Sequence, residues 1–233
     1  MDKKYSTSQV ASLFNSIART YDFLNHFLSG GMDFYWRRKA IKFLGQPVPD
    51  KILDVACGTG DFSIVAAKYG CKSVIGIDIA ENMLEIARNK IRKANFEDKI
   101  AFKIADAENL PFNDESFQAS IVAFGIRNFN NLKKGLAEIY RVLTKNGKFI
   151  ILEFSKPKHL LFRKLYFFYF QKILPLIGKI ISKNKIAYTY LPNTVMQFPE
   201  GKELNNILEE IGFRDVYHKT LTFGIVTVYV GTK

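Results

Sequence analysis

The chain has 233 residues, of which 48% are hydrophobic and 24% are charged. Its 34 lysines and arginines outnumber its 22 acidic residues and give a formal net charge of +12. This composition excludes a collagen, a low-complexity disordered chain and a disulfide-dense secreted module. Domains usually contain about 100–200 residues, so we expect one globular domain with a full apolar core.

The two cysteines, Cys57 and Cys71, have no metal-ligand or redox spacing, so we expect no bound metal and a reducing compartment. The first 30 residues contain charged residues and lack a continuous apolar region, so no signal peptide is expected. No stretch reaches the roughly 18 uninterrupted apolar residues of a membrane-spanning helix. The sequence therefore predicts a soluble, cytoplasmic chain.

Two helices are expected near the start of the chain. Apolar residues recur at helical spacing over residues 8–21, and a second helical pattern covers residues 35–44 after a turn-rich stretch. Pro47 and Pro49 then break the pattern. After these prolines, short apolar strand patterns replace the purely helical pattern.

Short strands and helices alternate over the next hundred residues. Strands are expected at 51–55, 73–79, 100–104, 118–124 and 148–154, with helices at about 61–69, 81–93 and 132–143 between them. This alternation predicts an α/β fold with a parallel sheet. A late helix over 202–211 and two strands, at 216–220 and 224–231, close the chain as a hairpin.

One long segment contains no acid. Between Glu153 and Glu200 the charged residues are all basic, and residues 156–185 also carry a run of phenylalanines and tyrosines. Basic residues interleaved with aromatic ones suit an anionic membrane surface or a nucleic acid. The alternative interpretation is a core-packing helix in a lysine-rich protein.

A glycine turn follows the first predicted strand and opens a helix. Residues 54–61 read D-V-A-C-G-T-G-D, and glycines there allow a sharp turn and close approach of a ligand to the backbone. Asp78 ends the next strand, where a carboxylate can accept hydrogen bonds from ribose hydroxyls. A dinucleotide fingerprint requires a third glycine where Ser63 stands, and there is no phosphate-binding G-x-x-x-x-G-K-[S/T] pattern.

An acid followed by this turn resembles motif I of the class I S-adenosylmethionine-dependent methyltransferases, with Ala56 in place of the first glycine. The resemblance implies a Rossmann-like fold with a mostly parallel sheet, a C-terminal antiparallel hairpin and S-adenosylmethionine as cofactor. It also implies roles for a set of cofactor-binding residues. Asp54 orders the turn, the turn passes beneath the methionine portion, Asp78 holds the ribose and two residues after the third strand meet the adenine. The full set is Asp54, Ala56, Gly58, Thr59, Gly60, Asp78, Met83, Asp106, Ala107 and Ala123. Met83 is equally well explained as a core residue.

Further segments resemble the C-methyltransferases of ubiquinone and menaquinone biosynthesis. They are Y-D-F-L-N at 21–25 with Ser29, Gly30 and W-R at 36–37, L-D-V-A-C-G-T-G-D at 53–61, F-G-I-R-N at 124–128, L-E-F-S-K-P at 152–157 and the region 188–199. Together the matches cover about residues 10–231. The resemblance implies methylation of a ring carbon of a prenylated quinol, a demethylmenaquinol by preference and a benzoquinol of ubiquinone biosynthesis as the alternative.

The same resemblance suggests catalytic residues. The N-terminal helices would form a lid that excludes water, offering Tyr21, Asp22 and His26, with Asp22 or His26 as the candidate base. Arg127 and Asn128 follow the fourth strand, where substrates lie in such folds. Arg127 would stabilise a ring oxyanion, or else tie its loop to an acid.

These features divide the single domain into a lid (1–46), a cofactor-binding core (50–155), a basic aromatic insertion (156–200) and a closing helix and hairpin (201–233). Within the insertion, residues 156–185 would rest on an anionic membrane surface and admit the prenyl tail. We therefore expect the protein at the inner face of the membrane. A base methyltransferase usually carries N-P-P-[Y/F] or P-C motifs, which are missing here, so no nucleic-acid partner is expected. A non-catalytic cofactor-binding protein stays open, and the oligomeric state is not predicted.

Overall fold

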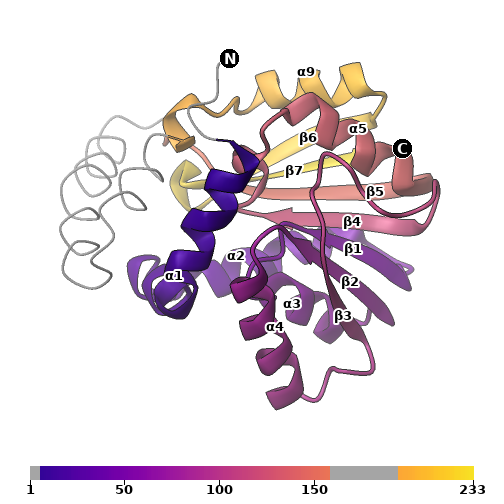
Figure 1. Cartoon of the computed structure of the whole chain (residues 1–233). Helices are drawn as coiled ribbons and strands as arrows, with labels where there is room; N and C mark the ends of the chain where they lie inside the picture. Colours follow the sequence, from indigo (N-terminus) through magenta and orange to yellow (C-terminus); the bar gives the residue numbers. More distant parts are fainter. Residues whose placement is uncertain (1–5, 158–193) are drawn as a thin grey trace.

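The computed structural model describes residues 6–157 and 194–233. Seven strands form one sheet in the order β3-β2-β1-β4-β5-β7-β6 (Figure 1). The strands are β1 Lys51–Val55, β2 Ser73–Asp78, β3 Ile100–Ile104, β4 Phe117–Ala123, β5 Leu143–Phe154, β6 Arg214–Leu221 and β7 Val226–Thr232. Strands β1 to β5 pair in parallel, while β7 runs antiparallel to both β5 and β6. The predicted α/β fold with a C-terminal antiparallel hairpin is therefore confirmed.

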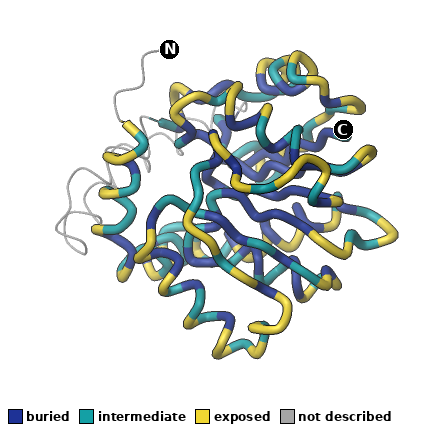
Figure 2. Tube along the Cα trace, turned by 45° about the vertical axis from the view of Figure 1, so that its right-hand side comes forward, coloured by how far each residue is buried: buried dark blue, intermediate teal, exposed yellow. Residues whose placement is uncertain are grey.

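Helices cover both faces of this sheet. The α-helices are α1 Thr7–Leu28, α2 Met32–Ala40, α3 Asp61–Tyr69, α4 Glu81–Lys93, α5 Leu132–Val142 and α9 Lys202–Ile211, and the 3-10 helices are η1 Ile41–Leu44, η2 Ile126–Asn128 and η4 Thr222–Gly224. Alternate residues of a strand point to opposite faces, so the strands contribute apolar side chains to two separate cores, one on each face of the sheet. One core packs under α2, η1 and α3, and the other packs under α5 and α9. Figure 2 shows the buried central strands between helices whose outer sides are exposed.

Helix α1 extends beyond its predicted end at residue 21. It begins with a capping box, in which Ser6 and Gln9 bond each other's backbone N–H groups, and it ends at Leu28. The polar pair Asn25-His26 interrupts the apolar pattern, but Leu24 is buried beside Ala80 and Met83 at the start of α4. Tertiary packing therefore supplies the last turns of the helix.

Two further elements differ in extent from prediction. The helix expected over 35–44 begins at Met32 and changes to the 3-10 helix η1 after Ala40. Strand β5 begins at Leu143 rather than at residue 148, because Leu143 pairs with Phe117 of β4 across a shift in register. Both differences depend on pairing or packing with distant residues.

The strand order places a crevice at one edge of the sheet. The chain leaves β1 toward β2 and β3 on one side, and β4 and β5 lie on the other, so the order reverses between β1 and β4. Ligands of open α/β sheets bind at such a switch point, beyond the carboxyl ends of the strands. Helix α1 contacts both α4 and α2, and Figure 1 shows it beside this edge.

Within residues 6–157 and 194–233, no helix is both long enough and apolar enough to span a bilayer. Most of the predicted basic aromatic insertion, from 158 to 193, lies outside the described residues. Lys156 is described, and its Nζ lies 3.7 Å from the carboxylate of Glu200.

Candidate functional site

Three adjoining cavities lie at the carboxyl ends of the central strands, and Ala56 lines all three. The first is also lined by Asp78, Asp106 and Ala107, and the second by Tyr21, Met83, Ala123 and Asn128. The third extends past Thr59 to Asp54, Arg37 and Asp61. Most of the predicted cofactor-binding residues thus line these adjoining cavities.

The glycine turn bends as the sequence predicts. Gly58 and Gly60 have φ of +55° and +80°, and Ala56 itself has φ +52°, a left-handed conformation that costs a non-glycine residue about 1–2 kcal/mol. A Cβ on Gly125 would lie 2.6 Å from that of Ala56, so the neighbouring loop needs its glycine. A Cβ on Gly58 would meet nothing within 4 Å, and the turn therefore leaves open space beside its backbone.

Asp78 is held at the end of β2 by two backbone bonds. Its carboxylate accepts from the N–H groups of Gly58 and Ala80, both at 2.9 Å. Burial raises the pKa of Asp78, although these two bonds oppose that change. The carboxylate lines the first two cavities, where it can accept from hydroxyls of a ligand.

Asp54 is completely buried beneath the turn. One oxygen accepts from the Ser63 hydroxyl at 2.5 Å, whereas Oδ1 has no hydrogen-bond partner. Burial raises the pKa of Asp54 to about 7. An unsatisfied carboxylate oxygen at a cavity wall suits a ligand cation, and the methionine portion of S-adenosylmethionine carries an ammonium group. The residues present therefore fit this cofactor.

The first cavity is also lined by the loop after β3. Asp106 accepts from the backbone of Glu108 at 2.9 Å, which fixes the loop that Ala107 completes. Met83 is 1% exposed, packs against α1 and also lines the second cavity. Both interpretations of Met83, as core residue and as cavity wall, are therefore consistent with its position.

Two of the predicted catalytic residues line the second cavity. Tyr21 comes from α1, and Asn128 comes from η2, which follows β4. Burial raises the pKa of the Tyr21 hydroxyl, which has Asn25 as a hydrogen-bond partner, and the charges of Arg127 and Arg37 act in the opposite direction. A residue with an aromatic hydroxyl and a residue with an amide thus line the same cavity.

Arg127 is tied to an acid. Its guanidinium donates to Glu153 at 2.8 Å and to the backbone oxygen of Phe124, and both charged groups are buried. Arg127 Nε and Glu153 Oε2 are left without partners. Because a buried ion pair holds its members rigidly, the pair fixes the loop that carries Asn128. A role of Arg127 at a ring oxygen stays a prediction.

Asp22 and His26 belong to a polar cluster beside the cavities. Lys90 of α4 bonds Asp22 at 3.0 Å and Thr59 at 3.2 Å and pairs closely with Asp61, while Asp22 accepts from Thr59 at 2.5 Å. We call Asp22, Thr59, Asp61 and Lys90 the latch. It joins α1 to the glycine turn, to α3 and to α4.

His26 lies next to the latch. Its Nδ1 is 2.8 Å from Asp33 of α2 and its Nε2 is 3.7 Å from Asp61. Ligand atoms of Asp22, His26 and Asp61 lie within 4.8 Å of one another, but the Lys90 ammonium already contacts both carboxylates. Neither Asp22 nor His26 lines the three cavities, and a role for either as a base stays a prediction.

Three polar residues of the site were not predicted from the sequence. Arg37 and Asp61 line the third cavity, and Lys90 forms the centre of the latch. Arg37 stands in the W-R segment and Asp61 ends the glycine motif, so both had a local signal. Lys90 lies on an ordinary charged helix face, and nothing local distinguishes it from its neighbours.

The fold and the site define the class of protein. A seven-stranded sheet with a terminal antiparallel hairpin, a glycine turn after β1 and an acid at the end of β2 are the features of an S-adenosylmethionine-dependent methyltransferase. Among solved structures, a possible histamine N-methyltransferase from Thermotoga maritima matches with TM-score 0.67 and 22% identity, covering 95% of this chain and 99% of that one. The [4+2]-cyclase SpnF matches with TM-score 0.72 and 14% identity over 98% and 96% of the two chains. Likenesses at this identity show the fold alone.

The chain belongs to the ubiE/COQ5 methyltransferase family, whose model matches residues 2–233. A demethylmenaquinone methyltransferase of Bacteroides fragilis is 44% identical over 97% of this chain and 93% of that protein. A ubiquinone/menaquinone biosynthesis C-methyltransferase of Citrifermentans bemidjiense is also 44% identical, over 97% of this chain and 96% of that protein. The predicted family is confirmed, and the chain is an enzyme of the methyltransferase class.

Proposed function

We propose that the protein methylates a ring carbon of a prenylated quinol, converting demethylmenaquinol to menaquinol. The observation that carries the proposal is the group of adjoining cavities around Ala56, which are lined by the predicted cofactor-binding residues and by Tyr21 and Asn128. Relatives named demethylmenaquinone methyltransferase in Bacteroides fragilis and Porphyromonas gingivalis, 44% and 42% identical, support the choice of substrate.

Cofactor binding follows from the predicted cofactor-binding residues, which we call the cofactor cradle. Asp78 accepts from the ribose hydroxyls, and Asp106 and Ala107 lie against the adenine with Met83 as an apolar wall. The turn from Ala56 to Gly60 carries the methionine portion, whose ammonium faces Asp54. Ala123, at the end of β4, lines both the second and the third cavity.

Methylating a ring carbon requires an electron-rich ring, and a quinol supplies one when a ring hydroxyl loses its proton. S-adenosylmethionine, when bound, would supply an electrophilic methyl group, whose bond to sulfur breaks as the bond to the ring carbon forms, and the proton of that ring carbon is then released to solvent. Tyr21 and Asn128 hold the ring hydroxyl by hydrogen bonds and orient the ring carbon. The Arg127 charge, anchored by Glu153, favours the ring oxyanion through the low-dielectric interior.

Helix α1 excludes water from the second cavity, which we call the substrate compartment. Its inner side places Val10, Phe14 and Tyr21 at the second cavity, and the latch holds the helix against the glycine turn. Because charge is less screened in a dry site, closure strengthens each of the polar contacts made to the ring. Asp22 acts here by holding the lid.

A prenylated quinol is dissolved in the bilayer, so the enzyme works at a membrane surface. We place the protein in the cytoplasm, peripherally on the inner face of the membrane, with the basic aromatic segment 156–185 as one contact. This segment lies almost wholly outside the described residues. The composition of the segment supports this contact. It contains eight basic and six aromatic residues and no acid, so anionic lipid attracts it.

A substrate panel tests the proposal. The purified protein is incubated with methyl-labelled S-adenosylmethionine and, in parallel, demethylmenaquinol, a benzoquinol precursor of ubiquinone, transfer RNA and ribosomal RNA. We expect label in the naphthoquinol at a rate well above the benzoquinol and no label in RNA. Faster transfer to the benzoquinol would reassign the substrate, and cofactor binding without any transfer would contradict the proposed activity.

A further inference from the structure

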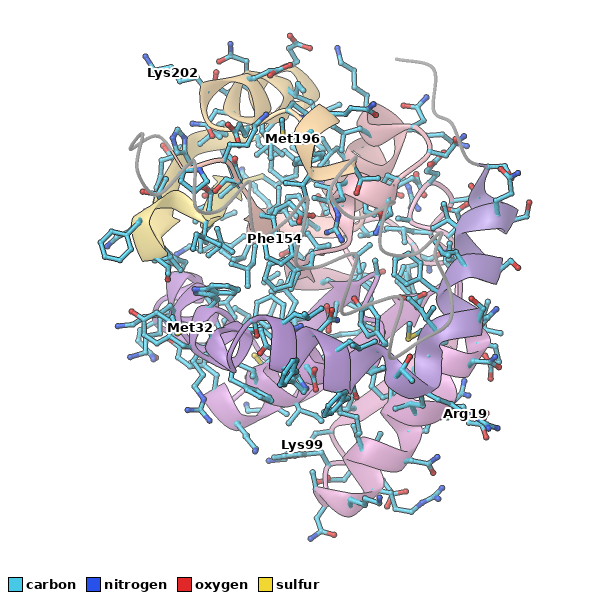
Figure 3. All side chains as sticks on the ribbon, turned by 90° about the vertical axis from the view of Figure 1, so that its left-hand side faces the viewer. Arg19, Met32, Lys99, Phe154, Met196 and Lys202 are labelled. Carbon is cyan, nitrogen blue, oxygen red and sulfur yellow. The ribbon has the colours of Figure 1, made fainter. Side chains whose placement is uncertain are left out.

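The outer side of the α1–α2 corner has an unusual composition. From residue 19 to residue 42, nine residues are exposed: four are aromatic, four are basic and one is a glycine. The aromatic residues are Phe23, Phe27, Phe34 and Tyr35, and the basic ones are Arg19, Arg38, Lys39 and Lys42. We call these eight residues the corner face. Figure 3 looks onto this side, with Arg19 and Met32 labelled at opposite ends of it.

No acid faces outward here. Asp22 and Asp33 are the two acids between residues 19 and 42, and both are turned to partners: Asp22 to Lys90, and Asp33 to His26 and Arg37. The acids therefore hold the corner together, while all four exposed charges of the corner are positive. The surface attracts anions without a compensating carboxylate.

The aromatic side chains form neighbouring pairs. Phe23 and Phe27 are each 58% exposed and stack on one another at 5.7 Å, and Phe34 stacks on His26 at 4.3 Å. The ammonium of Lys39 lies 5.4 Å from the centre of the Tyr35 ring. Contiguous exposed aromatic surface is rare on soluble monomers and marks a contact surface.

Helix α1 connects this surface to the substrate compartment. Residues 12, 16, 19, 23 and 27 are exposed along one stripe of the helix, whereas Tyr21 of the same helix lines the second cavity. A helix with phenylalanines and arginine outward and a basic neighbour is the pattern of an interfacial helix that lies on lipid. One element thus separates the outside surface from the reacting ring.

We infer that the corner face docks on an anionic lipid bilayer, with Phe23 and Phe27 inserted at the headgroup level and the four cations against the lipid phosphates. The docking itself follows from the charge and exposure of the corner-face residues, whereas its role in delivering substrate rests on the proposed function. Docking sets α1, the lid, at the interface where a prenylated quinol leaves the bilayer.

Co-sedimentation measures the docking. The full chain is mixed with vesicles of two parts phosphatidylcholine to one part phosphatidylglycerol, and with vesicles of phosphatidylcholine alone. The wild type is expected to bind the anionic vesicles. Lys39→Glu/Lys42→Glu and Phe23→Ser/Phe27→Ser should each lower the partition coefficient at least about tenfold. Lys99→Glu/Lys145→Glu changes the same number of charges at exposed positions near the amino ends of β3 and β5, and should stay within about twofold of the wild type.

A second measurement does not depend on losing binding. Because Cys57 and Cys71 are buried, an environment-sensitive fluorophore can be attached selectively to Phe23→Cys, with Lys145→Cys as the labelled control. Anionic vesicles should shift the emission of the label at position 23 to the blue and leave that at position 145 unchanged.

Several outcomes would overturn the inference. The first is that the wild type does not bind vesicles. The second is that neither double substitution changes the partition coefficient. The third is that the substitutions change the oligomeric state or RNA binding and leave lipid binding unchanged. Methylation of a water-soluble short-chain naphthoquinol should be unchanged in the folded variants. If the wild type did not methylate this naphthoquinol, the proposed function would be refuted, but the docking result would still hold.

Discussion

Asp78 combines two tasks at one carboxylate. It fixes the glycine turn through the N–H groups of Gly58 and Ala80, and it offers its remaining lone pairs to the first cavity. This double use explains why an acid ends β2 directly beside the turn. The carboxylate is already oriented before a ligand arrives, so little side-chain freedom is lost on binding.

The first prediction concerns this residue. Asp78→Ala should lower the affinity for S-adenosylmethionine by about 1–3 kcal/mol, because two ribose hydroxyls would be buried without an acceptor. Isothermal titration measures the loss, and thermal unfolding checks that the turn still forms. Asp98→Ala, at an exposed position before β3, is the control. Undiminished affinity in Asp78→Ala would remove Asp78 from the cofactor site.

Asp54 links the site to pH. Its folded pKa, about 7, lies above the value of 3.8 for a free aspartate, so the folded state binds the proton more tightly than the unfolded state. Its contribution to stability is then complete below about pH 4 and is lost as the pH rises to 7, by at most about 4 kcal/mol.

The second prediction follows because Asp54 loses its contribution to stability as the pH rises. Asp54→Asn keeps an oxygen for the Ser63 hydroxyl and cannot ionise, so the ligand-free variant should gain stability relative to the wild type between pH 4 and pH 7. Urea unfolding at a series of pH values measures the difference. A constant difference over this interval would show that Asp54 is ionised in the folded protein as readily as in water.

Sequence patterns predicted the local part of the site and missed its long-range part. The turn from Ala56 to Gly60 and the acid at Asp78 could be placed because each follows a short apolar strand in the chain. The partner of Asp22 could not, because Lys90 is brought to it only when α4 packs against α1. Likewise the pairing of Arg127 with Glu153 depends on β4 and β5 lying side by side.

In the proposed mechanism, helix α1 is the element that excludes water. One side contributes Tyr21 to the substrate compartment, another is fixed by the latch, and a third carries the exposed aromatic residues. Its apolar periodicity was sufficient to predict a helix, but not the last two turns, whose partners lie on α4. For β5, the Asn146-Gly147 pair suggests a turn, and only pairing with β4 extends the strand back to Leu143.

The third prediction separates binding from turnover on this helix. Tyr21→Phe should bind S-adenosylmethionine within about twofold of the wild type and lose about 100-fold or more in turnover of a short-chain naphthoquinol, because the Tyr21 hydroxyl no longer holds and orients the ring hydroxyl. Tyr217→Phe, at an exposed position of β6, is the matched control. Full turnover in Tyr21→Phe would remove this hydroxyl from the chemistry.

The fourth prediction tests the latch. Lys90→Met leaves Asp22 and Asp61 without their shared cation, so α1 should open more often and its amides should exchange with solvent about fivefold faster, the size expected of a partly exposed ion pair. Hydrogen exchange followed by mass spectrometry resolves α1 from α5, which should not change. Lys93→Met removes the same charge from an exposed position of α4. Equal protection of α1 in both variants would contradict the latch.

Across the whole molecule, the proposals assign the sheet to cofactor binding and the exposed positive charge of the corner face to lipid docking. The reversal of strand order puts the cofactor cradle at the carboxyl edge, and α1 covers that edge with its corner face outward (Figures 1 and 3). The α/β alternation made the fold predictable, because buried parallel strands and amphipathic helices have strong local patterns. The corner face was not predicted, since it becomes visible only when the partners of Asp22 and Asp33 are known.

In the proposed reaction, the cavities around Ala56 bring a methyl donor to a ring carbon of demethylmenaquinol. The most direct measurement is a single-turnover reaction of the purified enzyme with isotopically labelled S-adenosylmethionine and demethylmenaquinol, with the product located by nuclear magnetic resonance. We expect one labelled methyl group on the naphthoquinol ring carbon in the wild type, formed about 100-fold more slowly in Tyr21→Phe. A label on a ring oxygen, or no labelled quinol while the cofactor is bound, would contradict it.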